Sequence, residues 1–257
     1  MSDYPSLLSF KGKNVVITGG ASGAGRQIAE VFLKAKANVI ATYHHSEAEA
    51  FKMKEEHAVD PLTLYQLDLA KTESIQAFCT FLKETFGRID VLVNNAGIYP
   101  ARSLDLISEE DWDSMLNINT KGVFFLSRKI SKLMEKGSII NISSINATNP
   151  AENLIHYGVS KAGVEMLTRC FAQKLGPNIR VNCIAPGLIY KEGQEKFIPG
   201  WRESYSERSA LHRLVNAEEI GRVALFFASD LSSAVTGETL TVDCGVNLAP
   251  YFDNHLE

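Results

Sequence analysis

A glycine-rich segment, TGGASGAG, directly follows the short β-branched run NVVIT near the start of the chain. Apolar side chains then recur at helical spacing, which predicts a helix over residues 25–36. A backbone without side chains can approach a pyrophosphate closely, and a helix N-terminus adds unpaired N–H groups and partial positive charge. The positions concerned are Gly19, Ser22, Gly23, Ala24 and Gly25. This strand–turn–helix unit therefore predicts a site for the phosphates of a dinucleotide.

The rest of the chain alternates between strand-like and helix-like patterns joined by short connections. Strands are predicted over 14–18, 38–42, 62–67, 89–93, 138–142, 179–184 and 239–243, and helices over 25–36, 47–57, 72–86, 109–135, 157–175 and 217–229. Such alternation is typical of a parallel sheet with helices on both faces. We expect an α/β Rossmann fold in one domain, 1–257, with a doubly wound parallel sheet of about seven strands. Residues 188–215 interrupt the alternation.

Composition and charge exclude several classes of function. The net charge is −4 and the basic residues are scattered, so we expect neither a nucleic-acid partner nor an acidic-lipid partner. No apolar run approaches membrane-spanning length, and no signal segment is recognisable, so we expect a cytoplasmic protein. The four cysteines, Cys79, Cys170, Cys183 and Cys244, lie far apart in or beside apolar runs. That placement predicts buried free thiols and no metal site.

A tyrosine, a lysine and a serine form a second group of candidate functional residues. Tyr157 and Lys161 are four residues apart, so they share one face of the helix predicted there, and Ser144 precedes Tyr157 by thirteen residues. An ammonium beside a phenol favours the phenolate, which makes a proton donor and acceptor usable near neutrality. A serine hydroxyl nearby could hold a carbonyl or alcohol oxygen. A tyrosine–lysine pair at this spacing also arises by chance on exposed helices, and the dinucleotide loop favours the catalytic interpretation.

Further motifs occur in a fixed order along the chain. They are T-G-x-x-x-G-x-G from Thr18, Asn94-Asn95-Ala96-Gly97, Asn119, Ser144, Tyr157-x-x-x-Lys161 and Pro186-Gly187. The ordered set resembles the short-chain dehydrogenase/reductase family in its classical single-domain form, from about Phe10 to Asn247. The C-terminal part looks most like the 3-oxoacyl-carrier-protein reductase and the sugar and alcohol dehydrogenase branches.

The resemblance implies roles for four residues. Tyr157 would be the acid/base at the carbonyl or alcohol oxygen, and Lys161 would lower its pKa and bind the nicotinamide ribose. Ser144 would steady the substrate oxygen, and Asn119 would hold a water in a proton relay. Outside this set, Asn119 could simply cap or bend a helix and Ser144 could bond to backbone. All four are present, so we expect an active enzyme.

The resemblance also implies cofactor contacts where other strands end. They are Asn95, Ala96 and Gly97 beneath the adenosine ribose, Asp68 and Leu69 at the adenine edge, and Pro186, Gly187 and Ile189 at the nicotinamide carboxamide. Asp68 could instead cap a turn.

Cofactor preference depends on the end of the second strand. NAD-preferring relatives usually have an acidic residue there, whereas this chain has Tyr43 followed by His44. Many NADP-dependent relatives have arginine at the position of His44, and histidine is a pH-dependent phosphate partner. We expect NADP(H), with NAD(H) as the alternative.

The segment 188–215 carries Trp201 and other aromatic side chains among charges, which suits a substrate lid. Tyr99 and His156 are expected to complete the substrate pocket. Three residues depart from the family pattern: Ala24 replaces an isoleucine, Lys191 a threonine and Cys244 a glycine. The resemblance also implies that this chain forms a homotetramer through helices at about 111–135 and 157–175. A homodimer is the alternative.

These observations predict an NAD(P)(H)-dependent oxidoreductase that interconverts a small-molecule carbonyl and a secondary alcohol, a 3-oxoacyl-type reductase being one candidate. The alternative is an NAD-dependent alcohol or sugar dehydrogenase. A non-catalytic cofactor-binding regulatory protein is the third hypothesis.

Overall fold

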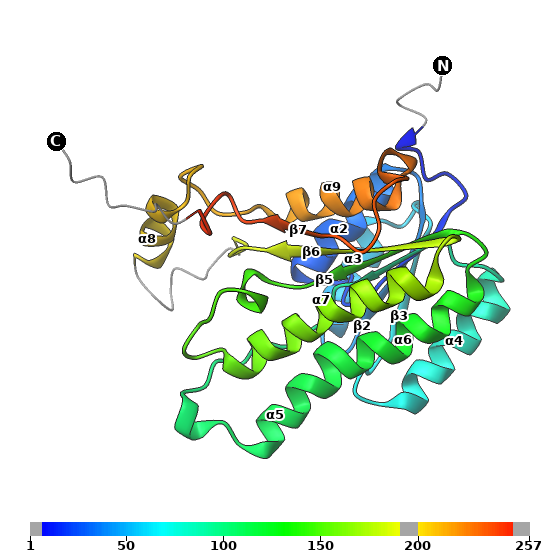
Figure 1. Ribbon diagram of the computed structural model, residues 1–257. Coiled ribbons are helices and arrows are strands. Elements are labelled where there is room, and N and C mark those ends of the chain that lie inside the picture. Colours follow the sequence, from blue (N-terminus) through cyan, green and yellow to red (C-terminus); the bar gives the residue numbers. More distant parts are fainter. Residues whose placement is uncertain (1–6, 191–199, 249–257) are drawn as a thin grey trace.

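The computed structural model describes residues 7–190 and 200–248, and its centre is one sheet of seven strands (Figure 1). The strands are β1 (Asn14–Ile17), β2 (Asn38–Tyr43), β3 (Leu62–Gln66), β4 (Val91–Asn94), β5 (Gly137–Ile142), β6 (Ile179–Pro186) and β7 (Thr239–Val242). They lie in the order β3-β2-β1-β4-β5-β6-β7, and every neighbouring pair is parallel. The predicted doubly wound α/β sheet is confirmed. Its strand order reverses between β1 and β4, and ligands of such sheets bind beyond the carboxyl ends of the strands at that point.

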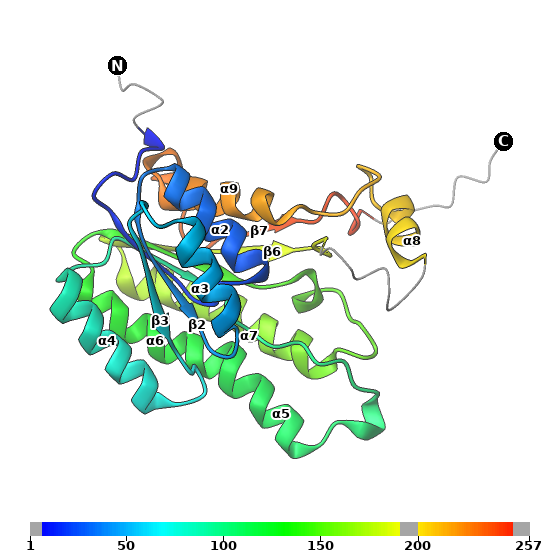
Figure 2. The same cartoon turned by 180° about the vertical axis from the view of Figure 1, so that it is seen from behind.

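Helices cover both faces of the sheet. They are α2 (Gly23–Lys34), α3 (Glu47–Glu56), α4 (Thr72–Phe86), α5 (Glu109–Leu116), α6 (Val123–Ile130), α7 (Ile155–Leu175), α8 (Trp201–Arg208) and α9 (Ala217–Ala228). Figures 1 and 2 show α2, α3 and α9 on one face and α4, α5, α6 and α7 on the other, with α8 beyond the end of β6. Because all seven strands are parallel, the connections that lead from strand to helix lie at the same edge of the sheet.

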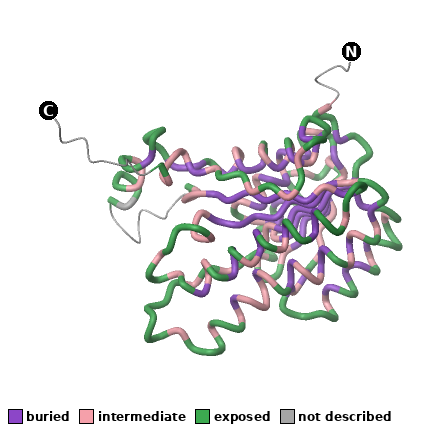
Figure 3. The backbone as a smooth tube through the Cα atoms, in the orientation of Figure 1, coloured by how far each residue is buried: buried purple, intermediate pink, exposed green. Residues whose placement is uncertain are grey.

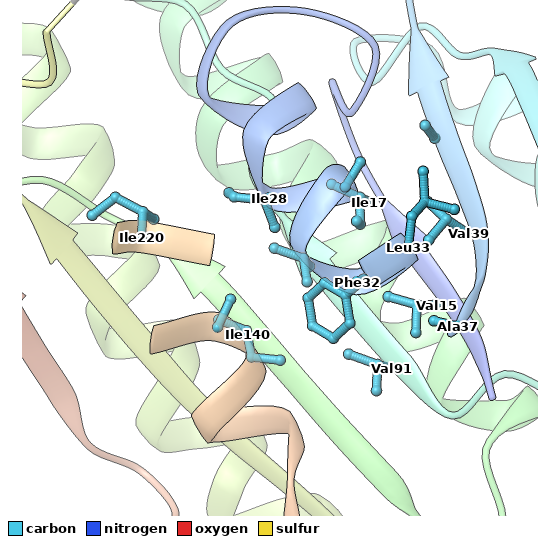
Figure 4. Close-up of a cluster of buried hydrophobic side chains, with 14 of the residues drawn as sticks. Val15, Ile17, Ile28, Phe32, Leu33, Ala37, Val39, Val91, Ile140 and Ile220 are labelled. Atoms are coloured by element: carbon cyan, nitrogen blue, oxygen red, sulfur yellow. The ribbon is translucent and has the colours of Figure 1, made fainter. Parts of the chain in front are cut away.

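The core consists of two apolar layers, one on each side of the sheet. Buried residues concentrate on the strands in Figure 3. Val15 and Ile17 face the layer beneath α2 and α9, where Phe32 is fully buried (Figure 4). Val16, between them in the sequence, faces the layer beneath α4, α6 and α7. This alternation follows from the two-residue period of a strand. It buries both faces of β1, the strand that leads directly into the glycine-rich turn.

The predicted helix over 109–135 is wrong in its middle. α5 passes into a π-helical segment, Asn117–Gly122, before α6 begins, and a short 3-10 turn, Ser131–Leu133, follows α6. The π segment carries Asn119, whose side chain bonds to both backbone groups of Ile98. Insertions of this kind often mark functional positions in helices. Hydrophobic spacing continues across one wider turn, so the sequence pattern did not reveal it.

A second difference concerns the segment 188–215, which was expected to be irregular and forms α8 over Trp201–Arg208. Lys191 and the side chain of Trp201 lie outside the part of the chain that the structure describes. The four cysteines are free, as predicted, but Cys170 is exposed and only Cys79 and Cys183 are fully buried. Among the described residues, no helix has the length and apolar character needed to cross a membrane, and no cluster of metal-ligating side chains is found.

Candidate active site

The glycine-rich turn is held by contacts from the end of β4. The hydroxyl oxygen of Thr18 accepts hydrogen bonds from the N–H groups of Asn95 (2.9 Å) and Ala96 (3.0 Å), and the Asn95 amide donates to the Thr18 carbonyl at 2.9 Å. Gly19 has φ +62°, in the left-handed region that favours glycine. A Cβ on Gly25 would lie 2.1 Å from the Gly19 carbonyl oxygen and 2.5 Å from the Asn95 amide nitrogen. The turn therefore requires glycine for its own packing.

A cavity of about 350 Å³ extends from this turn along the carboxyl ends of β1, β2, β3 and β4. Its lining includes twelve of the predicted cofactor residues: Gly19, Ser22, Gly23, Ala24, Gly25, Tyr43, His44, Asp68, Leu69, Asn95, Ala96 and Gly97. The N-cap residue of α2 makes no side-chain hydrogen bond to the first turn, so the helix N-terminus is not capped by its own chain. A glycine cradle that opens on such a terminus fits the pyrophosphate of a dinucleotide.

The far end of this cavity carries two histidines. The rings of His44 and His45 lie 3.7 Å apart between centroids, and His44 Nε2 lies 3.7 Å from a carboxylate oxygen of Asp68. The other Asp68 oxygen accepts the N–H of Ala70 at 2.9 Å, so the turn-capping role considered for Asp68 is present alongside its place in the cavity wall. Lys71 Nζ lies 3.3 Å from Asp68. This end of the cavity is therefore polar and sensitive to the charge of the histidines.

A second cavity, of about 360 Å³, lies beyond the ends of β5 and β6. Its lining includes the predicted Ser144, Tyr157, Lys161, Tyr99, Pro186, Gly187 and Ile189. Tyr157 and Lys161 come from the first turns of α7, and Ser144 follows β5. The Ser144 hydroxyl accepts a hydrogen bond from the N–H of Asn146 at 3.2 Å, so the backbone contact considered for this residue exists while the hydroxyl also faces the cavity. The structure thus brings the predicted catalytic residues of α7 and β5 into one cavity.

The ionisation of the pair differs from expectation. Burial raises the pKa of the Tyr157 phenol above its ordinary value of 10.0, and a hydrogen bond with the Ser144 side chain opposes that rise. Lys161 Nζ lies 5.7 Å from the centre of the Tyr157 ring and donates to the Ile142 carbonyl at 2.8 Å. Burial also lowers the pKa of Lys161 to about 8. In the protein alone the pKa of Tyr157 is therefore raised, against the expected lowering by the ammonium, because burial outweighs the hydrogen bond with Ser144.

Asn119 is fully buried and lines neither cavity. Its amide oxygen accepts the N–H of Ile98 at 2.9 Å, and its amide nitrogen lies 2.8 Å from the Ile98 carbonyl and 3.1 Å from the Ser160 hydroxyl. The side chain therefore fixes the loop after β4 against α7, just behind Gly97 and Lys161.

The expectation that His156 lines the substrate pocket is wrong. Its side chain is fully buried, and neither ring nitrogen has a hydrogen-bond partner among the residues that the structure describes. His156 precedes Tyr157 on α7 and therefore projects from a different face of the helix, toward α5, where it interacts electrostatically with Asp111. The side chain of Trp201 lies outside the described residues, so its expected substrate contact stays a prediction.

Several lining residues were missed from the sequence. They are Asn146 and Leu154 before α7, Leu188 after β6, and Thr42, Leu67 and Ile118 around the first cavity. Tyr205 of α8, an aromatic residue of the expected lid, was not missed: it lines the second cavity, and its hydroxyl accepts the N–H of Leu188 at 2.9 Å. The spacing of the missed residues from the motifs carries no distinctive signal, although Thr42, Leu67 and Leu188 lie where strands end, which could have suggested them.

The two cavities share Ala24, Asn95, Gly97 and Tyr99 in their walls. The two cavities are therefore adjacent, with the glycine-rich turn in the wall of one and Tyr157, Lys161 and Ser144 in the wall of the other. One end of the combined site suits phosphates, and the other offers a phenol, an ammonium and a hydroxyl to a reacting oxygen.

Comparison with known proteins agrees with this arrangement. A family model described as enoyl-(acyl carrier protein) reductase matches residues 19–247. The chain is 39% identical over 247 residues to a 3-oxoacyl-[acyl-carrier-protein] reductase of Thermotoga maritima, covering 93% of this chain and 99% of that protein. It is 37% identical over 257 residues to 3beta-hydroxysteroid dehydrogenase 1 of Eggerthella lenta, covering 95% and 97%.

A solved structure shares the whole fold. The gluconate 5-dehydrogenase of Burkholderia cenocepacia, in complex with NADP and tartrate, superposes with a TM-score of 0.89 at 26% identity, covering 96% of this chain and 100% of that one. The order of motifs, the sheet topology and these relatives agree, and the chain belongs to the short-chain dehydrogenase/reductase family as an NAD(P)-dependent oxidoreductase that acts on CH–OH and C=O groups.

Proposed function

We propose that Tyr157, Lys161, Ser144 and Asn119 form the catalytic set of this oxidoreductase. The observation that carries the proposal is the wall that the two cavities share. It places the cavity of the glycine-rich turn next to the cavity that contains the phenol of Tyr157. A nicotinamide cofactor supplies or accepts the hydride when bound. The protein must then hold the cofactor, orient the substrate oxygen and move one proton.

The proton is assigned to the Tyr157 hydroxyl. In reduction the phenol donates its proton to the oxygen that becomes the alcohol, and in oxidation the phenolate accepts that proton back. The Ser144 hydroxyl, which already interacts with Tyr157, holds the same oxygen. Lys161 places a buried positive charge beneath the reacting groups, and Asn119 fixes the loop that carries Gly97.

The cofactor preference proposed is NADP(H), with NAD(H) as the alternative. β2 ends in Tyr43 without the acidic residue that would repel a 2′-phosphate. His44, His45, Ser22 and Ser46 line the adjoining part of the cavity, and all four can donate hydrogen bonds to an anion. The Burkholderia relative with bound NADP is consistent with this assignment.

The substrate proposed is a 3-oxoacyl-type carbonyl compound, reduced to the secondary alcohol. The relative from Thermotoga acts as such a reductase by name, and the walls of the second cavity include apolar residues such as Leu154 and Leu188. Oxidation of an alcohol or sugar with NAD is the second candidate, favoured by the name of the Burkholderia relative. A non-catalytic regulatory role fits less well, because Ser144, Tyr157 and Lys161 share one cavity.

We also propose that the chain acts as one domain, with 188–215 as substrate lid, and assembles as a homotetramer or homodimer through α5 and α7. Trp112, Ile155, Val159 and Met166 on these helices are 36% to 54% exposed, and contact with a second copy of the chain would cover them. The cytoplasmic location expected from the sequence stays a prediction.

An activity panel tests the proposed function. Acetoacetyl thioester, a 3-ketosteroid and a keto sugar acid are each offered with NADPH and with NADH, and the corresponding alcohols with the oxidised cofactors, while nicotinamide absorbance is followed. We expect the highest kcat/KM for thioester reduction with NADPH. Faster alcohol oxidation with NAD than any reduction would instead support the second candidate. Cofactor binding without turnover of any compound would support the regulatory one.

A further inference from the structure

Glu165 is a buried carboxylate that the proposed mechanism does not use. It lies on α7 one turn after Lys161 and two turns after Tyr157, so the three side chains share one face of the helix. Its residue is only 7% exposed, and none of the ion pairs found within residues 7–190 and 200–248 includes it. A carboxylate buried without a cation is costly unless hydrogen bonds stabilise it. The hydrogen-bond partner of the Glu165 carboxylate therefore indicates what this residue does.

That partner is Ser143, the first residue after β5. The Ser143 hydroxyl lies 3.1 Å from Oε1 of Glu165 and 3.2 Å from the backbone carbonyl of Lys161. A hydroxyl has one proton, and a carboxylate accepts it more strongly than a carbonyl does. The N–H of Ser143 donates to the Ile184 carbonyl of β6 at 2.7 Å. Ser143 thus ties β5, β6 and α7 together at the floor of the second cavity.

The residues on either side of Ser143 carry groups of the site. The carbonyl of Ile142 accepts the Lys161 ammonium at 2.8 Å, and the hydroxyl of Ser144 interacts with Tyr157. A displacement of Ser143 would therefore move both the anchor of the ammonium and the substrate-facing hydroxyl relative to the phenol. Figure 1 shows β5 and α7 side by side, as this connection requires.

We propose that Glu165 is a positioning residue, whose carboxylate accepts the Ser143 hydroxyl and holds segment 142–144 in register with Tyr157 and Lys161. The inference rests on the proposed catalytic set. Glu165 acts through Ser143 and does not touch the reacting oxygen. Glu165 and Lys161 each interact electrostatically with Cys183 of β6, so the carboxylate and the ammonium both lie near the same buried thiol.

A double-mutant cycle tests whether Glu165 acts through Ser143. The variants are Glu165→Ala, Ser143→Ala, the double variant, and Glu165→Gln, which retains an oxygen that accepts the hydroxyl. We expect each alanine variant to lower kcat by about 10- to 100-fold, because small misplacements of reacting groups have effects of that size. The double variant should lose no more than the larger single one, and Glu165→Gln should stay within about threefold of wild type. The dissociation constant of the cofactor, measured by fluorescence, should stay unchanged throughout.

A matched control is Ser138→Ala at the opposite end of β5. Ser138 is as buried as Ser143 and donates its hydroxyl to the Phe227 carbonyl at 3.0 Å, far from the cavity. Its loss should lower the melting temperature and leave kcat unchanged. If Glu165→Ala does not fold, Ser143→Ala against Ser138→Ala carries the comparison alone.

The inference is overturned if the losses in kcat are additive, if Glu165→Gln loses as much as Glu165→Ala, or if the variants melt earlier with wild-type kcat. Tyr157→Phe distinguishes this failure from failure of the proposed function. If Tyr157→Phe remains active, the proposed catalytic set itself is wrong. If Tyr157→Phe is inactive and Glu165→Ala has the kcat of the wild type, only the positioning role of Glu165 is wrong.

Discussion

The ammonium nitrogen of Lys161 lies 2.8 Å from the carbonyl oxygen of Ile142, and this bond joins α7 to the end of β5. The lysine is 5% exposed, and burial lowers its pKa to about 8 from the ordinary 10.5. A buried cation with one backbone partner has lost more hydration than it regains. The residue proposed to be essential for turnover is therefore predicted to destabilise the fold.

Lys161→Met should accordingly raise the free energy of unfolding near neutrality while abolishing turnover. The difference between a pKa of about 8 and the ordinary 10.5 corresponds to about 3 kcal/mol below pH 8. Loss of the bond to Ile142 offsets part of that, so we expect a net gain of about 1 to 2 kcal/mol in urea unfolding at pH 7.

The pH dependence of that gain has a definite sign. Between about pH 8 and 10.5 the unfolded lysine binds more protons than the folded one, so the wild type gains stability as pH rises. The advantage of Lys161→Met should therefore shrink across this window. Lys52→Met, at an exposed lysine of α3, is the control and should show no such change. A variant less stable than wild type at pH 7 would contradict the prediction.

Tyr157→Phe removes the proposed proton donor and little else. We expect kcat to fall by about 100- to 10,000-fold, the range that general acid–base groups contribute. Cofactor affinity should stay at the wild-type value in a fluorescence titration. Tyr65→Phe, half-buried against Phe78 and Phe81 away from both cavities, should leave kcat unchanged. Substantial turnover by Tyr157→Phe would mean that another group moves the proton.

The pH–rate profile should depend on Ser144. The raised pKa of Tyr157 keeps its phenol protonated at neutral pH, which favours reduction, and oxidation should accelerate as pH rises. The Ser144 side chain holds that pKa down, so Ser144→Ala should shift the rise in the oxidation rate to higher pH. Steady-state oxidation measured across the alkaline range tests this. A profile that keeps its position but loses amplitude would show that Ser144 only binds substrate.

Gly25→Ala should disrupt the glycine-rich turn before any cofactor is added. Its Cβ would lie 2.1 Å from the backbone oxygen of Gly19, so backbone must shift. Gly23→Ala is the matched control, since Gly23 has φ +53° but open space around its Cβ position. In urea unfolding of the cofactor-free protein, we expect Gly23→Ala to lower the free energy of unfolding by about 1 to 2 kcal/mol. Gly25→Ala should lower it by clearly more. Equal losses would contradict the prediction, because they would mean that the turn yields to the added methyl group at little cost.

NADPH affinity should decrease between about pH 6 and pH 8, because histidine loses its charge over that range. NADH affinity should change little, since it lacks the 2′-phosphate. His44→Gln should remove part of the dependence, because His44 lines the part of the cavity proposed to hold the 2′-phosphate. Fluorescence titrations at both pH values measure this. Tighter binding of NADH than NADPH at either pH would contradict the proposed preference.

Local patterns were sufficient for much of the site. The turn between Thr18 and Gly25 is encoded by residues close in sequence, and the four-residue spacing of Tyr157 and Lys161 needs only a helix to place both on one face. The parallel sheet followed from alternating apolar segments, because buried parallel strands and amphipathic helices have distinct periods.

Features that depend on packing were not predictable in the same way. α8, WRESYSER, is polar all round and so lacks the apolar stripe that indicates a helix. The orientation of His156 depends on where α5 packs, and the pKa of Tyr157 depends on how much water the folded chain removes. Such properties arise from contacts between segments far apart in the sequence.

The π segment Asn117–Gly122 also affects how length changes in this chain are tolerated. α5 packs against α7, whereas α6 packs against α4, so the wider turn changes which face of a continuous helix meets each neighbour. Each residue of an α-helix rotates the chain by about 100°, and a one-residue deletion within 117–122 could restore regular winding while turning one half against its neighbour. Design or recombination across this helix therefore has to conserve residue number here, even where residue identity is free to vary.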